Sequence, residues 1–333
     1  MKGAVLISAA ALFVCCIACQ DSVNPKAEMK NQTVFYCFIN QDTLFQTAYL
    51  SRVYDVNTSN PNDNKADPFV EGAVIRIDYK SNSYLFSDSS VERIDESRYN
   101  TPFRFYYNDK LNLKSTVLFD LPMPISVQVS LADGTTLSSN TQTIPSGDIL
   151  FEKYPMVIPD KANATSETFQ WDFFSTKNSV EKYYYLSKLE LVYTKRINGA
   201  DVPMKMEVPV KTIGSGDAEQ VRYPEITRQN LVYFSIENIK YVMNKISEGD
   251  PDKNNYGVKN MIFTLKIMDK NIAQYYAAGQ TFKDEFSMRI DAPDLTNING
   301  GLGMFGIYAQ RTKSVGLDRG FAASFGYRYL ENK

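Results

Sequence analysis

Apolar and polar residues alternate along much of the chain, and this pattern predicts mainly β-strands. Residues 202–210 are apolar at every second position, as expected for a strand with one buried face. Residues 33–40 and 99–107 are rich in β-branched and aromatic side chains, which favour strands. Asp133-Gly134 separates two further runs and predicts a hairpin turn. Since helical repeats do not separate the strands of the first half, we expect antiparallel sheets.

Two stretches carry a helical repeat instead. Ser235 can cap apolar residues spaced by three and four, which predicts a helix at 235–247, and Asp269 can cap a second at 269–278. The 333 residues are enough for two cores. We therefore expect an immunoglobulin-like antiparallel sandwich at residues 30–145. A second β-rich domain, which contains both short helices, should follow at residues 146–333.

The N-terminus has the features of a bacterial lipoprotein signal. A largely apolar run of 15 residues ends at Ala18, which is shorter than the ~20 residues of a transmembrane helix. A small residue directly before Cys19 fits the cleavage site of such signals, although Cys16 stands where leucine is usual. We expect a signal peptide at 1–18, lipid on Cys19 and a polar tether at 19–29. The acyl chains would then hold the protein on a membrane.

The remaining composition excludes several classes of chemistry. The chain has no histidine, which removes Ser-His-Asp and Cys-His catalysis and histidine-ligated zinc. The formal net charge of -2 gives no basic surface for nucleic acid. Cys37 is the one cysteine beyond Cys19, so we expect no disulfide and a buried Cys37. No motif indicates a cofactor, and we expect a protein without enzymatic activity.

Two runs place oxygen-bearing side chains at alternate positions, as calcium loops do. Both lack glycine at the sixth position and glutamate at the twelfth, where Ala66 and Met261 stand. We therefore interpret both as polar loops without a metal. The two runs are Asp55, Asn57 and Ser59, and Asp250, Asp252 and Asn254.

Aromatic residues are the candidates for a glycan site. We consider Trp171, Tyr183 and Tyr185 as ligand-facing residues, with packing in the core as the alternative. Neighbouring strand residues point to opposite faces, so at least one of residues 183–185 should face outward. A hydrolase would need only two carboxylates, but no motif selects a pair among the 38 acidic residues.

Three segments carry a resemblance to a known family. Residues 36–52 and 70–77 are similar to its opening strands, and residues 297–306 are similar to its glycine motif near the C-terminus. On these segments the chain resembles a family of Bacteroidota outer-membrane lipoproteins of unknown function. A phosphate loop is excluded because the motif lacks Gly-Lys-Ser/Thr, so we interpret it as a structural corner. Its glycines are Gly300, Gly301, Gly303 and Gly306.

The resemblance implies a location and a partner but no reaction. Members are often encoded beside TonB-dependent receptors, and their N-terminal part resembles a carboxypeptidase-regulatory-like domain. It therefore implies a lipid-anchored outer-membrane protein that is a non-enzymatic accessory of a TonB-dependent transport system. Asp21, close behind Cys19, occupies the place of the acidic residues that direct such lipoproteins to the cell surface. The alternatives are an independent glycan-binding surface lipoprotein and a hydrolase with paired carboxylates.

Overall fold

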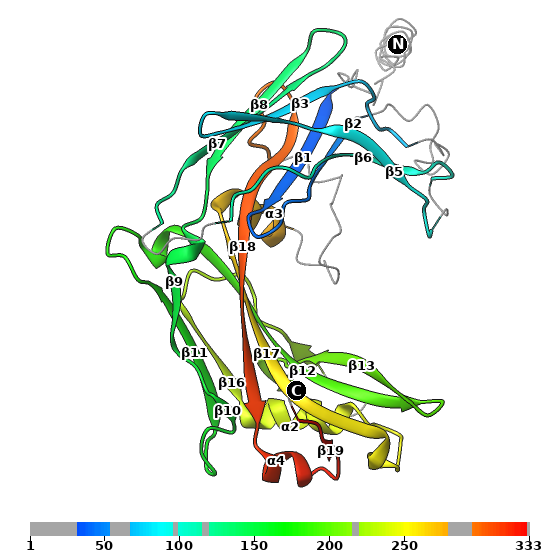
Figure 1. Ribbon diagram of the computed structural model, residues 1–333, viewed down its shortest axis with the longest axis vertical. Helices are drawn as coiled ribbons and strands as arrows, with labels where there is room; N and C mark the ends of the chain where they lie inside the picture. The colour runs from blue at the N-terminus through cyan, green and yellow to red at the C-terminus, as the bar shows by residue number, and fades with distance from the viewer. Residues whose placement is uncertain are drawn as a thin grey trace, which may run out of the picture.

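A computed structural model shows an elongated protein with two lobes stacked end to end (Figure 1). Strands make up 51% of the described residues and helices 12%, which confirms the mainly β class. Cys19 and the run Asp55, Asn57 and Ser59 lie outside the described residues. The structure describes residues 32–53, 67–95, 99–114, 120–214, 220–278 and 295–331.

The upper lobe is a sandwich of antiparallel sheets, as the strand pattern predicts. Strands β4-β3-β7-β8 form one sheet, and β1, β2, β6 and β5 are consecutive in the other. Inward side chains of both sheets, such as Leu50, Ile75 and Val127, are 0–1% exposed and share one core. The strands are β1 (Thr33–Asn40), β2 (Gln46–Arg52), β3 (Val74–Tyr79), β4 (Asn82–Leu85), β5 (Ser87–Val91), β6 (Phe103–Asn108), β7 (Pro124–Ser130) and β8 (Thr136–Gln142).

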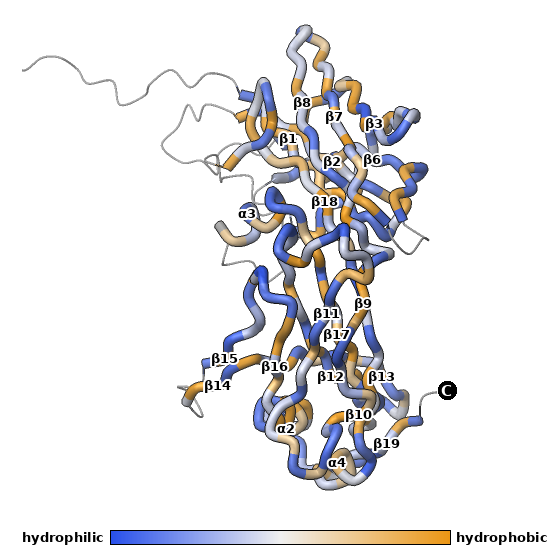
Figure 2. Tube along the Cα trace, turned by 90° about the vertical axis from the view of Figure 1, so that its left-hand side faces the viewer, coloured by the Kyte–Doolittle hydropathy of each residue, from blue (hydrophilic) through white to orange (hydrophobic). Residues whose placement is uncertain are grey.

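The lower lobe is also built from two layers. A three-stranded sheet, β16-β11-β9, packs through its inward side chains against β12, β17 and β18. The hairpin of β14 and β15 projects from the side of this lobe (Figure 2). The strands are β9 (Ile149–Lys153), β10 (Val157–Ile158), β11 (Ser166–Phe173), β12 (Tyr184–Ile197), β13 (Ala200–Glu207), β14 (Lys211–Ile213), β15 (Gln220–Arg222), β16 (Leu231–Ser235), β17 (Tyr256–Met268), β18 (Leu302–Leu317) and β19 (Arg328–Tyr329).

Both predicted helices are present. Helix α2 (Ile236–Lys245) starts after Ser235, whose hydroxyl accepts a hydrogen bond from the Asn238 amide at 3.1 Å. Helix α3 (Lys270–Ala278) starts after Asp269. A third helix, α4 (Arg319–Ala323), was not predicted because five residues are too few to show a helical repeat. Among the described residues, no helix has the length and apolar character needed to cross a membrane. The part of the chain that the structure describes also contains three 3₁₀ turns: η2 (Ser146–Asp148), η3 (Val180–Lys182) and η5 (Lys253–Asn255).

Strand β18 joins the lobes into one sheet. Its first half pairs in parallel with β1, from Val34 opposite Leu302 to Asn40 opposite Tyr308. Its second half runs antiparallel to β17 in the lower lobe (Figure 1). The predicted division at residue 145 therefore does not separate the lobes, because the start of β18 belongs to the upper one.

A buried polar network fixes the waist between the lobes. The Gln41 amide donates to the Ile144 carbonyl at 2.6 Å and to the Ser146 hydroxyl at 2.8 Å, and it accepts from the Ile144 amide. Arg311 of β18 donates to the Asp42 carboxylate at 3.0 Å and to the Ser146 carbonyl at 2.9 Å. Gln41 and Ser146 are 1% and 0% exposed, so the hydrogen bonds of Gln41 are shielded from water. These hydrogen bonds and the continuous strand β18 therefore connect the two lobes.

Candidate ligand-binding site

The three aromatic residues expected to face a ligand are core residues instead. Trp171 and Tyr185 are completely buried, and Tyr183 is 7% exposed. The Trp171 and Tyr185 rings lie 5.2 Å apart between the two layers of the lower lobe. The expectation is corrected because alternation separates two strand faces without showing which face another sheet covers. Tyr184, between the two tyrosines, is on the opposite face and is only partly buried.

The glycine motif lets β18 and α3 approach their neighbours. Gly303 has a φ of +111°, and a Cβ there would lie 2.0 Å from the Phe35 carbonyl oxygen of β1. A Cβ on Gly306 would lie 2.5 Å from the side chain of Ile272 in α3. Gly300 and Gly301 are equally restricted, since a Cβ at either would lie 2.5–2.7 Å from a backbone oxygen. The motif is thus a packing corner at Gly303 and Gly306, while Gly300 and Gly301 also line a cavity of about 300 Å³ beside Arg52 and Asp133.

The described acidic run after α2 uses its oxygens within its own turn. The Asp250 carboxylate accepts from the Asp252 amide at 3.0 Å, and Asp252 accepts from the Asn254 amide at 3.1 Å. The backbone hydrogen bond from Asp252, with a further one from the Tyr256 hydroxyl, lowers the pKa of Asp250. Within the described ranges no group of three acidic or cysteine side chains could hold a metal.

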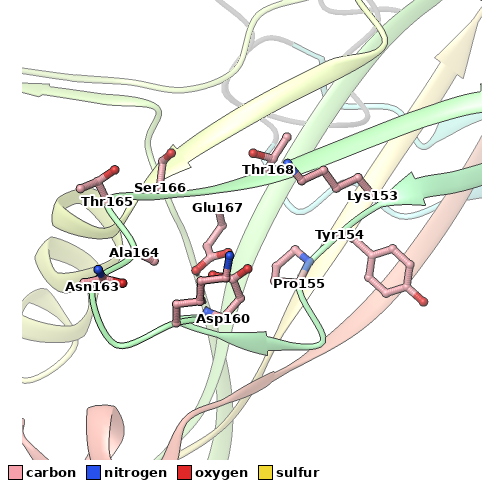
Figure 3. Close-up of a pocket in the computed structure, with 11 residues that line it drawn as sticks. Lys153, Tyr154, Pro155, Asp160, Asn163, Ala164, Thr165, Ser166, Glu167 and Thr168 are labelled. Carbon is pink, nitrogen blue, oxygen red and sulfur yellow. Dashed lines mark hydrogen bonds between the residues drawn. The ribbon is translucent and has the colours of Figure 1, made fainter.

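A cavity of about 340 Å³ opens in the lower lobe where β9, β10 and β11 meet (Figure 3). Its lining is mostly polar and includes Lys153, Lys161, Asp160 and Glu167. These four charges cancel formally. The volume is at the lower end of the roughly 300–1,000 Å³ usual for small-molecule sites. The cavity is therefore suited to a small polar ligand.

Glu167 is the most buried charged group of this cavity. The inward face of β11 carries Glu167, Phe169, Trp171 and Phe173 in alternation, so the carboxylate occupies the first of four inward positions, followed by three aromatic core residues. Glu167 is 2% exposed, and it accepts one hydrogen bond, at 3.0 Å, from the Asp160 amide. Burial, and to a smaller extent the nearby charge of Asp160, raise the pKa of Glu167.

The two lysines of the cavity are exposed and have no ion-pair partner among the described residues. Figure 3 shows Lys153 extended toward Thr168, whereas Glu167 points toward Asp160. The neighbouring Tyr154 ring is turned away from the cavity toward β18, where the Lys313 ammonium lies 5.1 Å from its centre. Tyr154 is thereby held in place and contributes no stacking platform inside the cavity.

A second surface lies on the outer face of the upper lobe. Phe103, Phe105 and Tyr107 alternate along β6, opposite to Tyr106, which is buried in the sandwich. Phe45 stacks on Tyr107 with ring centres 5.7 Å apart, and the rings of Phe103 and Phe105 stack at 6.0 Å. Phe45 is 52% exposed and the three aromatic residues of β6 are partly exposed. We call these four residues the aromatic row.

Fold and sites together define a two-lobed, mainly β protein with a small polar cavity in one lobe and an aromatic row on the other. No family model matches the chain, and no characterised protein matches it. Function is therefore argued from the described geometry.

Glu167 was missed from the sequence, although the inward pattern of residues 167–173 contained a signal. A charged residue on the buried face of a strand is unusual unless it is paired or faces a ligand.

Proposed function

We propose that the protein is a non-enzymatic binding protein, anchored in the outer membrane through lipid on Cys19, which serves as an accessory of a TonB-dependent transport system. The observation that carries the binding role is the cavity around the buried carboxylate of Glu167. The anchor and the transporter come from the leader and from the family resemblance. The distance between the cavity and the start of β1 supports this proposal further.

The cavity lies far from the N-terminal end of the described chain. Val34 pairs with Leu302 at the upper end of β18, and Val157, beside the cavity, pairs with Gly316 at its lower end. These pairs are 14 residues apart along β18. At about 3.3 Å per residue, the separation is on the order of 45 Å. An anchor before residue 32 would thus leave the lower lobe projecting from the membrane.

The connection of the lobes at the waist would make this projection useful for presentation of a ligand. A hinge would let the lower lobe move relative to the upper lobe. Instead, β18 passes through both lobes without interruption, and the hydrogen bonds of Gln41 connect the lobes at the waist. The cavity would then be held at a constant distance from the start of β1, on the side away from the anchor, where a receptor could meet it.

Purification from the native outer membrane tests this function. The full-length protein is isolated in mild detergent, together with a Cys19→Ala variant that cannot be lipidated. We expect a TonB-dependent receptor to co-purify with the anchored protein and to be reduced with the variant. Isolation of the anchored protein alone, with the receptor present in the same membranes, would contradict the transport role.

Glycan binding is a second candidate, and the aromatic row favours it. Partly exposed rings in a line can stack on the apolar faces of successive sugars. Phe45→Ala should then weaken binding on a glycan array, whereas Leu44→Ala, 51% exposed and outside the row, should not. Equal signals from the two variants would remove the row from consideration.

A further inference from the structure

The buried carboxylate of Glu167 lacks a cationic partner in the protein. Its single hydrogen bond comes from the backbone of Asp160, and no ion pair of Glu167 occurs among the described residues. Buried charges in proteins are normally paired or fully hydrogen-bonded, because the lost hydration must be replaced. A ligand that enters the cavity with a positively charged donor would supply the missing partner.

The cavity also offers the opposite charge. Lys153 and Lys161 are exposed at its edge and make no ion pair within the described part of the chain. Lys153 extends toward Thr168 and away from Asp160 (Figure 3), so the ammonium group of Lys153 is separated from the carboxylates of Asp160 and Glu167. An anionic ligand would meet the carboxylates of Glu167 and Asp160, and a cationic ligand would meet the ammonium group of Lys153. A molecule with both charges matches both ends.

We propose that the cavity binds a small zwitterion, a free α-amino acid or a short peptide, with its ammonium group on Glu167 and its carboxylate at Lys153. Thr168, beside Lys153, adds a hydroxyl donor for the carboxylate. The volume of about 340 Å³ limits the ligand to a small one. This assignment rests on the proposed function, since it names the ligand class of the same cavity.

Calorimetric titration of the full mature protein in detergent tests the assignment. The probes are single amino acids, the same amino acids with acetylated amino groups, and their carboxamides. We expect free amino acids to bind and both blocked forms to bind at least about tenfold more weakly, because each lacks one of the two charges. Equal affinity of free and acetylated forms would overturn the role of Glu167.

Two variants with a matched control localise the binding. Glu167→Gln keeps the size and the acceptor oxygen but removes the charge, and Lys153→Met keeps the stem without the ammonium. Both should lose affinity by about tenfold or more. Glu152→Gln is the control, since Glu152 is exposed on β9 and does not line the cavity. A loss of the same size in this control would place the ligand elsewhere.

The same titrations with common hexoses separate the two proposals. Hexose binding that Glu167→Gln abolishes, without amino-acid binding, would overturn the zwitterion assignment and leave the binding role of the cavity intact. Cleavage of a glycoside by the wild-type protein that is lost in this variant would overturn both and favour a hydrolase. Absence of any binding to the cavity would also overturn both.

Discussion

Replacement of Gly303 by alanine should destabilise the protein by pushing β18 away from β1. Gly303 has a φ of +111°, in the region that side-chain-bearing residues rarely adopt. A Cβ would lie 2.0 Å from the carbonyl oxygen of Phe35, and 2.7 and 2.8 Å from two further backbone atoms of that residue. Since backbone atoms cannot rotate away as a side chain can, the two strands would have to separate.

The expected loss combines two effects. The left-handed conformation costs about 1–2 kcal/mol for a residue with a Cβ. Overpacking against the neighbouring strand adds about 1–3 kcal/mol. The control is Gly134→Ala, because Gly134 has a φ of +86° in the β7–β8 turn but nothing within 4 Å of an added Cβ. It should therefore show the conformational cost alone, and Gly303→Ala should be less stable than Gly134→Ala by at least about 1 kcal/mol.

Urea unfolding of the mature wild type and both variants, followed by tryptophan fluorescence, measures this difference. Trp171 lies in the lower core, so its signal also shows whether loss of β18 contacts in the upper lobe reaches the lower lobe. If Gly303→Ala and Gly134→Ala lose the same stability with the same slope, the close approach of β18 to β1 is refuted.

Three further predictions concern buried groups. Burial raises the pKa of Asp269 in the folded protein above its value in the unfolded chain. The stability that Asp269 contributes is therefore fully present below its pKa in the unfolded chain, and it is lost as the pH rises through its pKa in the folded protein. Asp269→Asn should flatten the pH dependence of the unfolding free energy above about pH 4, and an unchanged slope in urea titrations would contradict this. Gln41→Ala removes the hydrogen-bond partner of the buried Ile144 amide and of the Ser146 hydroxyl, and it should lower the free energy of unfolding by about 2–4 kcal/mol in the same assay. A change near zero would show that water replaces these hydrogen bonds. Trp171→Ala should cost about 3–5 kcal/mol because the side chain is completely buried; since Trp171 is the one tryptophan of the chain, urea unfolding of this variant is followed by circular dichroism. A variant that keeps its stability but binds ligand more weakly would instead show that Trp171 is a site residue.

Local signals in the sequence predicted much of the fold. The caps at Ser235 and Asp269 located both longer helices, because the cap oxygen and the apolar spacing are close together in the chain. The Asp133-Gly134 turn located the β7–β8 hairpin for the same reason. The parallel pairing of β1 with β18 joins segments about 270 residues apart, and nothing local marks it.

The candidate site was less accessible from the sequence. Alternation showed that Trp171 and Tyr185 share a face with other apolar residues, but exposure depends on which sheet covers that face. The cavity depends on the turn that brings Asp160 back over Glu167, which is a tertiary feature. A charged residue, Glu167, on the buried face of β11 was the one feature of the sequence that indicated this site.

Hydrogen exchange of the full mature protein tests the central claim most directly, namely that the lower-lobe cavity is the ligand site. Exchange is compared without ligand, with a mixture of the twenty common amino acids, and separately with a mixture of common hexoses. We predict slower exchange at residues 149–168 with the amino acids, and no such change in Glu167→Gln. Unchanged exchange there with both mixtures, or protection confined to residues 103–107 of the aromatic row, would contradict the account.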